Sequence, residues 1–123
     1  MLIFRVEASL LYFNAEHVRQ EIWREIRSLE TKPRLVLGDL STSPYVDVAG
    51  ARMLRELQEE LAASGIALRL AEARSGVRDI LRAEGLEERV GYFGRRITVA
   101  DAIDEFHGGT GAVAPAVSTA PAT

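Results

Sequence analysis

The sequence contains no cysteine, and this absence excludes several kinds of protein at once. Without a thiol, the chain can have no disulfide framework, no thiolate metal site and no cysteine nucleophile. Its two histidines, His17 and His107, lie far apart in the sequence, so a histidine metal site is not expected either. No apolar run approaches the roughly 20 residues of a membrane-spanning helix, and the first residues lack the basic-then-apolar order of a signal peptide. The chain as given is therefore expected to be soluble.

The size and charge of the chain favour one globular domain. Its 123 residues are 47% hydrophobic, enough for one core and too few for two domains. The net charge of -3 gives no reason to expect a nucleic-acid partner, and we interpret the arginines of residues 74–96 as a solvated basic face. From Gly108 onwards there is no charged residue and hardly any large apolar one. We therefore expect a folded domain over residues 1–106 and a disordered C-terminal tail over residues 107–123.

The centre of the chain predicts a strand, a loop and a helix in direct succession. Residues 34–40 form a short, branched apolar run typical of a buried strand, and the turn residues that follow end it. Asp47 is placed to cap the next helix, because its carboxylate can accept hydrogen bonds from the first free N–H groups. Leucines at helical spacing, Leu54, Leu57 and Leu61, predict a buried face on this helix. A second apolar run at 66–71 then predicts a strand that lies parallel to residues 34–40.

The flanking segments predict further helices and strands. Residues 2–7 and 10–13 are expected to form a hairpin of two strands. A helix capped by Asn14 should follow and end before Pro33, because proline disfavours helix in the residue before it. The other expected elements are a short helix from Ser75 closed by Gly85, an edge strand at 90–93, and a last helix opened by Thr98 to Asp101.

The loop after residues 34–40 gathers the candidates for chemistry. It holds two carboxylates and several hydroxyls, but no histidine or lysine lies close in the sequence to act as a base. Asp47 is better explained as a helix cap, and Asp39 as a strand-end residue that bonds the loop backbone. No glycine-rich phosphate loop is present, and Asp47 already occupies part of the positive end of the helix. We therefore expect no catalytic residue, no metal and no enzyme activity.

The order of these elements and several short segments resemble a STAS domain over residues 2–106. The segments are Asp39-Leu40-Ser41, then Asp47 and Gly50 at the start of a long helix, and residues 98–102 near the last helix. Residues 11–17, Leu-Tyr-Phe-Asn-Ala-Glu-His, are similar to STAS domains at the cytoplasmic C-terminus of SulP-type sulfate and anion transporters. Anti-sigma factor antagonists instead carry a Gly-x-Leu-Asp segment there. The resemblance implies an α/β STAS-like fold, a mixed sheet flanked by four to five helices.

The same resemblance implies a regulatory contact role. It predicts a non-catalytic domain on the cytoplasmic side of the cell membrane, part of an integral membrane transporter whose transport domain would precede Met1. The partners it implies are that transmembrane domain and a cytosolic regulatory protein, with no nucleic acid. Two alternatives stay open, a stand-alone protein like an anti-sigma factor antagonist and a guanine-nucleotide-binding module. No cofactor is expected beyond weak binding of GTP or GDP, which some STAS domains are reported to show.

One residue departs from the antagonist branch of the family. That branch has a serine or threonine directly before the glycine, and a kinase phosphorylates it, whereas this chain has Ala49, which offers no hydroxyl. Hydroxyls of the preceding loop are the alternative acceptors, although satisfying the turn backbone also explains them. We expect the binding and regulatory surface in this loop and the first helical turn. Its residues are Asp39, Ser41, Thr42, Ser43, Pro44, Tyr45, Asp47, Val48, Ala49, Gly50 and Arg52.

Overall fold

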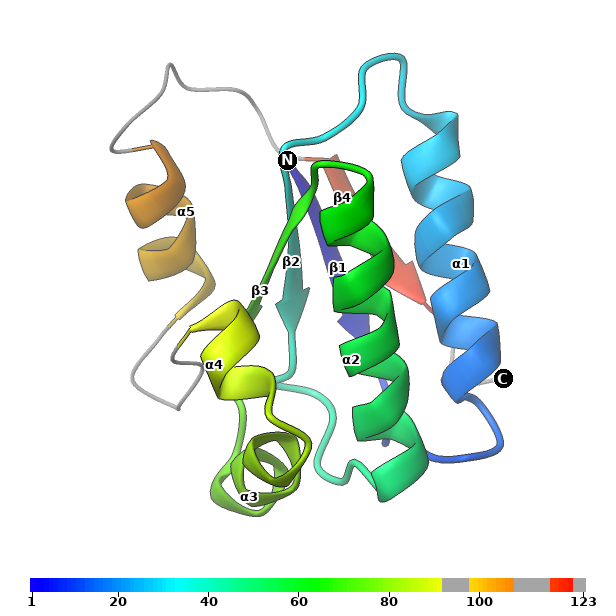
Figure 1. Ribbon diagram of the computed structural model, residues 1–123, viewed down its shortest axis with the longest axis vertical. Coiled ribbons are helices and arrows are strands. Elements are labelled where there is room, and N and C mark those ends of the chain that lie inside the picture. Colours follow the sequence, from blue (N-terminus) through cyan, green and yellow to red (C-terminus); the bar gives the residue numbers. More distant parts are fainter. Residues whose placement is uncertain (92–97, 108–115, 121–123) are drawn as a thin grey trace.

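The computed structural model describes residues 1–91, 98–107 and 116–120, and shows an open sheet with helices on both faces (Figure 1). The helices α1 and α2 cover one face, and α5 covers the other. This layered α/β arrangement is the one predicted. The elements in chain order are β1 (Leu2–Val6), α1 (Ala15–Ser28), β2 (Leu35–Asp39), α2 (Val48–Ala63), β3 (Ala67–Ala71), α3 (Ser75–Ala83), α4 (Leu86–Val90), α5 (Val99–His107) and β4 (Ala116–Ala120).

The four strands lie in the order β3-β2-β1-β4, and every described pairing is parallel. β2 pairs with β3 from Leu35 opposite Ala67 to Asp39 opposite Ala71. The predicted parallel neighbours at 34–40 and 66–71 are thus confirmed. The carboxyl ends of β1 and β2 therefore lie at the same edge of the sheet, where the loops to α1 and α2 begin.

The buried faces of the helices follow the predicted spacing. Leu54, Leu57 and Leu61 of α2 are fully buried and belong to the larger core, which also takes in α1 and one face of the sheet. On the opposite face, Ala102 of α5 packs in a smaller cluster with Leu37 and other residues of β1 and β2. The predicted start of α5 is also confirmed, since the Thr98 hydroxyl accepts a hydrogen bond from the Asp101 N–H at 3.0 Å.

The predicted hairpin of residues 2–7 and 10–13 is wrong. Residue 10 forms only a single parallel bridge, with Val46, and a turn leads from it into α1. The Leu10 N–H donates to the Tyr45 carbonyl at 2.9 Å, and the Leu10 carbonyl accepts from the Asp47 N–H at 3.2 Å. These bonds direct the backbone of Leu10 towards the loop before α2, so residues 10–13 do not pair with β1.

Asn14 lies directly before α1, as predicted, but its side chain does not have the predicted capping role. Its carboxamide oxygen accepts from the Leu11 N–H at 2.8 Å, and its Nδ2 donates to the Ser9 carbonyl at 2.9 Å. The side chain is buried and makes no capping bond to the helix. Asn14 therefore fixes the shape of the 8–14 loop and does not satisfy the first turn of α1.

The predicted disordered tail over 107–123 requires correction in two places. α5 extends through His107, and residues 116–120 form β4, which pairs with β1 from Leu2 opposite Ala116 to Val6 opposite Ala120. Backbone hydrogen bonding to an open sheet edge needs no large apolar side chain, so a composition of small residues did not prevent it. Residues 108–115 and 121–123 lie outside the described part of the chain.

The predicted edge strand at 90–93 is also corrected in part. Val90 is the last residue of α4, and residues 92–93 lie outside the described residues.

Gly85 has the expected left-handed conformation between α3 and α4, with φ of 75°. Arg74, and not Ser75, occupies the cap position of α3, and its side chain makes no capping hydrogen bond.

Candidate functional site

Two loops meet at the N-terminal end of α2, at the lower end of the view in Figure 1. The 8–14 loop follows β1 and the 40–47 loop follows β2. The backbone bonds of Leu10 to Tyr45 and Asp47 join them. All residues of the predicted regulatory surface lie in the second loop, at the end of β2 or in the first turns of α2, so the structure brings them to one end of the molecule.

Asp47 connects both loops to the helix. One carboxylate oxygen accepts from the Gly50 N–H at 2.8 Å, which is the predicted capping bond. The other oxygen accepts from the Tyr12 N–H at 2.8 Å, a contact that the sequence did not predict. Asp47 therefore fixes the position of the 8–14 loop as well as the start of α2.

Gly50 allows the two segments to approach closely. A Cβ atom at this position would lie 2.4 Å from the Leu10 carbonyl oxygen, far inside van der Waals contact. Gly50 is buried in the first turn of α2. Packing therefore explains why position 50 is a glycine, because the 8–14 loop crosses directly over it.

Asp39 is a buried carboxylate at the end of β2. Its Oδ2 accepts from Arg5 Nε at 2.8 Å, and its Oδ1 accepts from the Ser41 N–H at 2.9 Å. Burial alone would raise the pKa of Asp39, but hydrogen bonds from the Ser41 side chain and backbone and from Arg5 outweigh it, so the pKa is lowered. Asp39 therefore holds the loop backbone, as predicted, and ties β2 to β1.

Asp39 should contribute stability that depends on pH. Since its folded-state pKa is lowered, the contribution is fully present above the ordinary value of about 3.9 and is lost as pH falls through the lowered value. We expect Asp39→Asn to reduce the free energy of unfolding by about 1 to 3 kcal/mol at neutral pH, and by less in acid. Urea denaturation at neutral pH and near the acid limit of folding measures this difference. The exposed Asp79→Asn is the control, and an equal loss at both pH values would contradict the assignment.

The hydroxyls of Thr42 and Ser43 satisfy backbone, which was the simpler of the two predicted explanations. The Thr42 hydroxyl donates to the Val6 carbonyl at 2.8 Å and the Ser43 hydroxyl to the same oxygen at 3.1 Å. Ser43 is fully buried, and Thr42 is exposed. These bonds attach the 40–47 loop to the end of β1.

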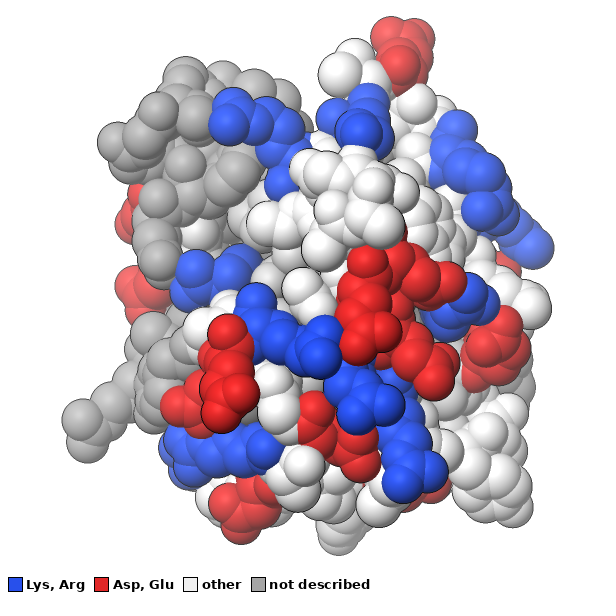
Figure 2. Space-filling model, viewed as in Figure 1, with Lys and Arg blue, Asp and Glu red and all other residues white. Residues whose placement is uncertain are grey.

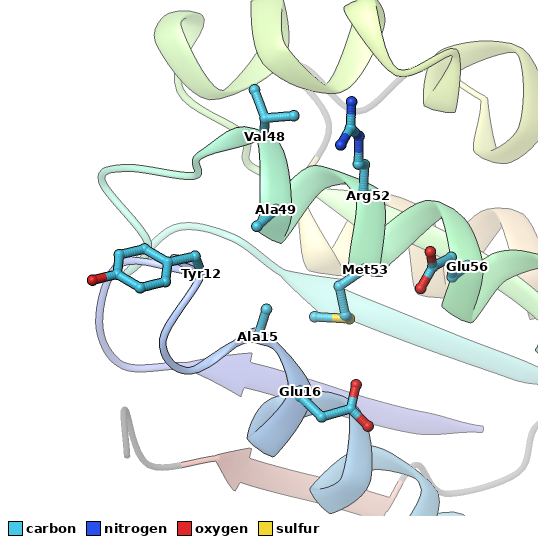
Figure 3. Close-up of a pocket in the computed structure, with 8 residues that line it drawn as sticks. All are labelled: Tyr12, Ala15, Glu16, Val48, Ala49, Arg52, Met53 and Glu56. Carbon is cyan, nitrogen blue, oxygen red and sulfur yellow. The ribbon is translucent and has the colours of Figure 1, made fainter.

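An open groove with a volume of about 490 Å³ lies between the starts of α1 and α2 (Figure 3). We call it the α1–α2 groove, and Met53 and Ala15 form its buried floor. Tyr12 and Val48 stand at its rim with exposed fractions of 76% and 50%. The residues that line the groove are Tyr12, Ala15, Glu16, Val48, Ala49, Arg52, Met53 and Glu56.

The exposed aromatic residues of the 8–14 loop were not predicted from the sequence. Tyr12 and the neighbouring Phe13 are both exposed, and their rings stack edge to face with centroids 5.6 Å apart. The run of four apolar residues at 10–13 resembled a strand, although it lacks the alternation of a half-buried strand. Only Leu10 of the run is buried. That missing alternation was the signal that could have identified the loop.

Polar side chains at this end of the molecule hold other parts of the chain in place. The carboxylates of Asp39 and Asp47 both hold backbone groups in place. Within the described ranges, no three His, Cys, Asp or Glu side chains gather as a metal site. Arg52 is exposed, and its Nε lies 3.5 Å from Glu84 Oε1. Across residues 1–91, 98–107 and 116–120, no helix has the length and apolar character needed to cross a membrane.

Comparison with known proteins places this geometry in a family. A family model described as "STAS domain" matches residues 1–105. The chain is 29% identical over 116 residues to Sulfate transporter 2.2 of Arabidopsis thaliana, covering 85% of the chain and 17% of that protein. It is 28% identical over 111 residues to High affinity sulfate transporter 1 of Stylosanthes hamata, covering 84% of the chain and 17% of that protein.

Solved structures share the fold at lower sequence identity. The murine Solute Carrier 26 family member A9 anion transporter superposes with a TM-score of 0.72 at 19% identity, covering 88% of this chain and 18% of that one. The SulP transporter STAS domain from Vibrio cholerae superposes with a TM-score of 0.62 at 20% identity, covering 87% of this chain and 84% of that one. The chain spans only 17% of the length of the curated relatives that it matches. With a family model that matches residues 1–105 and with this shared fold, the chain belongs to the STAS domain family.

Proposed function

We propose that this chain is the regulatory domain of an anion transporter, acts on the cytoplasmic side of the membrane, and works by protein contact without catalysis. The proposed partners are the transmembrane domain of the parent transporter and a cytosolic regulatory protein. The likeness to sulfate transporters in sequence, and to anion transporter domains in fold, supports this assignment. The substrate of the parent transporter would be an anion of the sulfate class.

The observation that carries the contact role is a concentration of exposed apolar side chains at one end. The large hydrophobic side chains that are exposed among the described residues are Tyr12, Phe13, Tyr45 and Val48. All four belong to the two loops and the first turn of α2, and we call them the loop-end surface. Soluble proteins rarely gather exposed apolar side chains without a partner for them. Asp47 and Gly50 hold this surface in one conformation, which lowers the entropy cost of binding.

This role does not depend on a phosphate at position 49. Ala49 is half-buried at the groove and has no hydroxyl, while the Ser43 hydroxyl is buried and donates to Val6. We therefore propose that the domain is regulated by what occupies the loop-end surface, and not by a phosphate at position 49.

Introducing a charge at position 49 should test the contact role. We expect Ala49→Glu to change anion transport by the intact protein that carries this domain, because the new carboxylate would enter the contact surface. Ala100→Glu is the control, since Ala100 is the second residue of α5, as Ala49 is of α2, and it is exposed outside the loop-end surface. Both variants should unfold at the wild-type temperature. Unaltered transport with Ala49→Glu at normal expression would contradict the proposal.

Asp47→Ala would not distinguish an effect on partner contacts from an effect on the stability of the fold. The variant removes the cap of α2, which costs about 0.5 to 2 kcal/mol, and it also releases the Tyr12 N–H. It would therefore disturb the loop-end surface and the stability of α2 together.

The gene sequence before Met1 distinguishes the transporter assignment from the stand-alone alternative. Several membrane-spanning segments encoded there would support a transporter domain. A stop codon there, beside a kinase gene, would favour a protein like an anti-sigma factor antagonist.

Guanine nucleotides should bind weakly. The Asp47 carboxylate stays at the positive end of α2, where it opposes a phosphate, and the helix start lacks the Lys-Ser/Thr pair of a phosphate loop. We expect dissociation constants well above about 1 μM for GTP and GDP. Titration followed by amide chemical shifts measures both the affinity and the location. Tighter binding, or shifts centred far from residues 41–52, would contradict this expectation.

A further inference from the structure

We propose that the α1–α2 groove binds a peptide segment of a partner protein in which a large apolar side chain stands next to Lys or Arg. This inference rests on the contact role proposed above and adds the chemistry of the partner. Two features of the groove lead to it, an apolar floor and rim at one end and an excess of carboxylates at the other.

The floor and rim suit one large apolar side chain. Figure 3 shows the Met53 side chain reaching from α2 towards α1, with Tyr12 beyond it at one end of the groove. Met53 is only 4% exposed, so its thioether forms a floor and not a protrusion. Methionine adapts its shape to an inserted group, and a tyrosine at the rim offers a large rigid contact area.

The other end of the groove is acidic on both walls. Glu16 comes from α1 and Glu56 from α2, and Figure 3 shows Glu56 on the side of Met53 away from Tyr12 and Glu16 on the facing helix, across from Met53. Figure 2 shows acidic side chains gathered over α2 beside the basic ones nearer its N-terminus. The groove thus places carboxylates within reach of a cation that is attached beside the apolar group.

The charge of this end is only partly balanced by the domain itself. Arg19 pairs with Glu16, at 2.9 Å, and also with Glu60, so one guanidinium serves two carboxylates. The Glu56 side chain makes no hydrogen bond or ion pair with the residues that the structure describes. Arg52, on the same helix, lies 3.5 Å from Glu84 and is not paired with Glu56. An incoming Lys or Arg would provide the missing countercharge.

The same charges favour a peptide over a lipid surface. Exposed aromatic residues such as Tyr12 and Phe13 could also insert at a membrane interface. Anionic headgroups, however, would meet the carboxylates of Glu16 and Glu56, whereas a basic peptide would be attracted by them.

The experiment uses the full 123-residue chain and two synthetic probes. One is a short amidated peptide of leucine and lysine, and the other has glutamate in place of every lysine. Amide chemical shifts locate binding and calorimetry gives the affinity for wild type, Tyr12→Ala, Glu56→Gln and Glu88→Gln. Glu88 is an exposed glutamate on α4, so its variant makes the same change in net charge away from the groove. Vesicles of phosphatidylcholine with phosphatidylserine test the lipid surface.

We expect the leucine–lysine peptide to change the amide chemical shifts of residues 12–16 and 48–56. It should bind at least about tenfold more tightly than the leucine–glutamate peptide. Glu56→Gln and Tyr12→Ala should each weaken it by about fivefold, and Glu88→Gln should not. Equal affinity for both peptides, equal effects of Glu56→Gln and Glu88→Gln, or groove shifts with vesicles alone would overturn the proposal. If the peptide fails while Ala49→Glu still alters transport, the partner chemistry is wrong and the contact role stands.

Discussion

Leu57→Ala is expected to lower the free energy of unfolding by about 2 to 5 kcal/mol, the range for a fully buried leucine. Leu57 is 0% exposed at the centre of the α2 face that packs on the sheet, and its removal would leave a cavity among buried neighbours. Urea denaturation followed by circular dichroism measures the change. The loss is a large share of the total stability of a small domain.

Val48→Ala is the control for this prediction. Val48 lies on the same helix with half of its surface exposed, and shortening it should change stability by less than about 0.5 kcal/mol. If Leu57→Ala cost no more than Val48→Ala, the assignment of the buried face of α2 would be wrong.

Gly50→Ala is expected to cost about 1 to 3 kcal/mol, although alanine ordinarily favours a helix. The added methyl group would lie 2.4 Å from the Leu10 carbonyl oxygen, which is backbone and cannot rotate away. The 8–14 loop must then move off the start of α2, and the bond from the Tyr12 N–H to Asp47 should break with it.

Gly76→Ala provides a matched comparison for Gly50→Ala. Gly76 also lies in the first turn of a helix, but a Cβ atom there would meet nothing within 4 Å. The same substitution should therefore stabilise the chain by about 0.5 kcal/mol or more. Opposite signs for the two variants in urea denaturation are the expected result. A stabilising Gly50→Ala would mean that the 8–14 loop does not lie against α2 in solution.

The central part of the fold could be predicted because its information is local. The leucine spacing of α2, the capping residue Asp47 and the apolar runs of β2 and β3 each lie within a short segment. The parallel pairing of β2 with β3 followed from the handedness rule for a strand, helix and strand. These features depend on neighbouring residues in the sequence, so one sequence was enough.

The 8–14 loop could not be predicted in the same way because distant groups determine its shape. Leu10 bonds to Tyr45 and Asp47, and the Tyr12 N–H bonds to the Asp47 carboxylate. These partners are about 35 residues away in the sequence. An apolar run at 10–13 therefore looked like a strand, and the exposed aromatic part of the candidate site was missed with it.

The sequence predicted only one half of the candidate site, which lies in the 40–47 loop and the first turns of α2. Asp47 was identified by its capping position, and Asp39 by its place at the end of a strand. The other half, Tyr12 and Phe13 with the acidic wall of α1, becomes adjacent only when β1 and β2 pair. Sequence order alone does not reveal that adjacency.

The position of β4 beside β1 has a consequence for the order of folding. β1, β2 and β3 join through short crossovers, but residues 2 and 116 are partners from opposite ends of the chain. Closing a loop of that length costs roughly 4 kcal/mol of chain entropy, and little is recovered until most of the pairing has formed. Contacts of such high sequence separation form late. The sheet should therefore assemble outward from β2, and β1 should spend the early part of folding with one edge open to solvent.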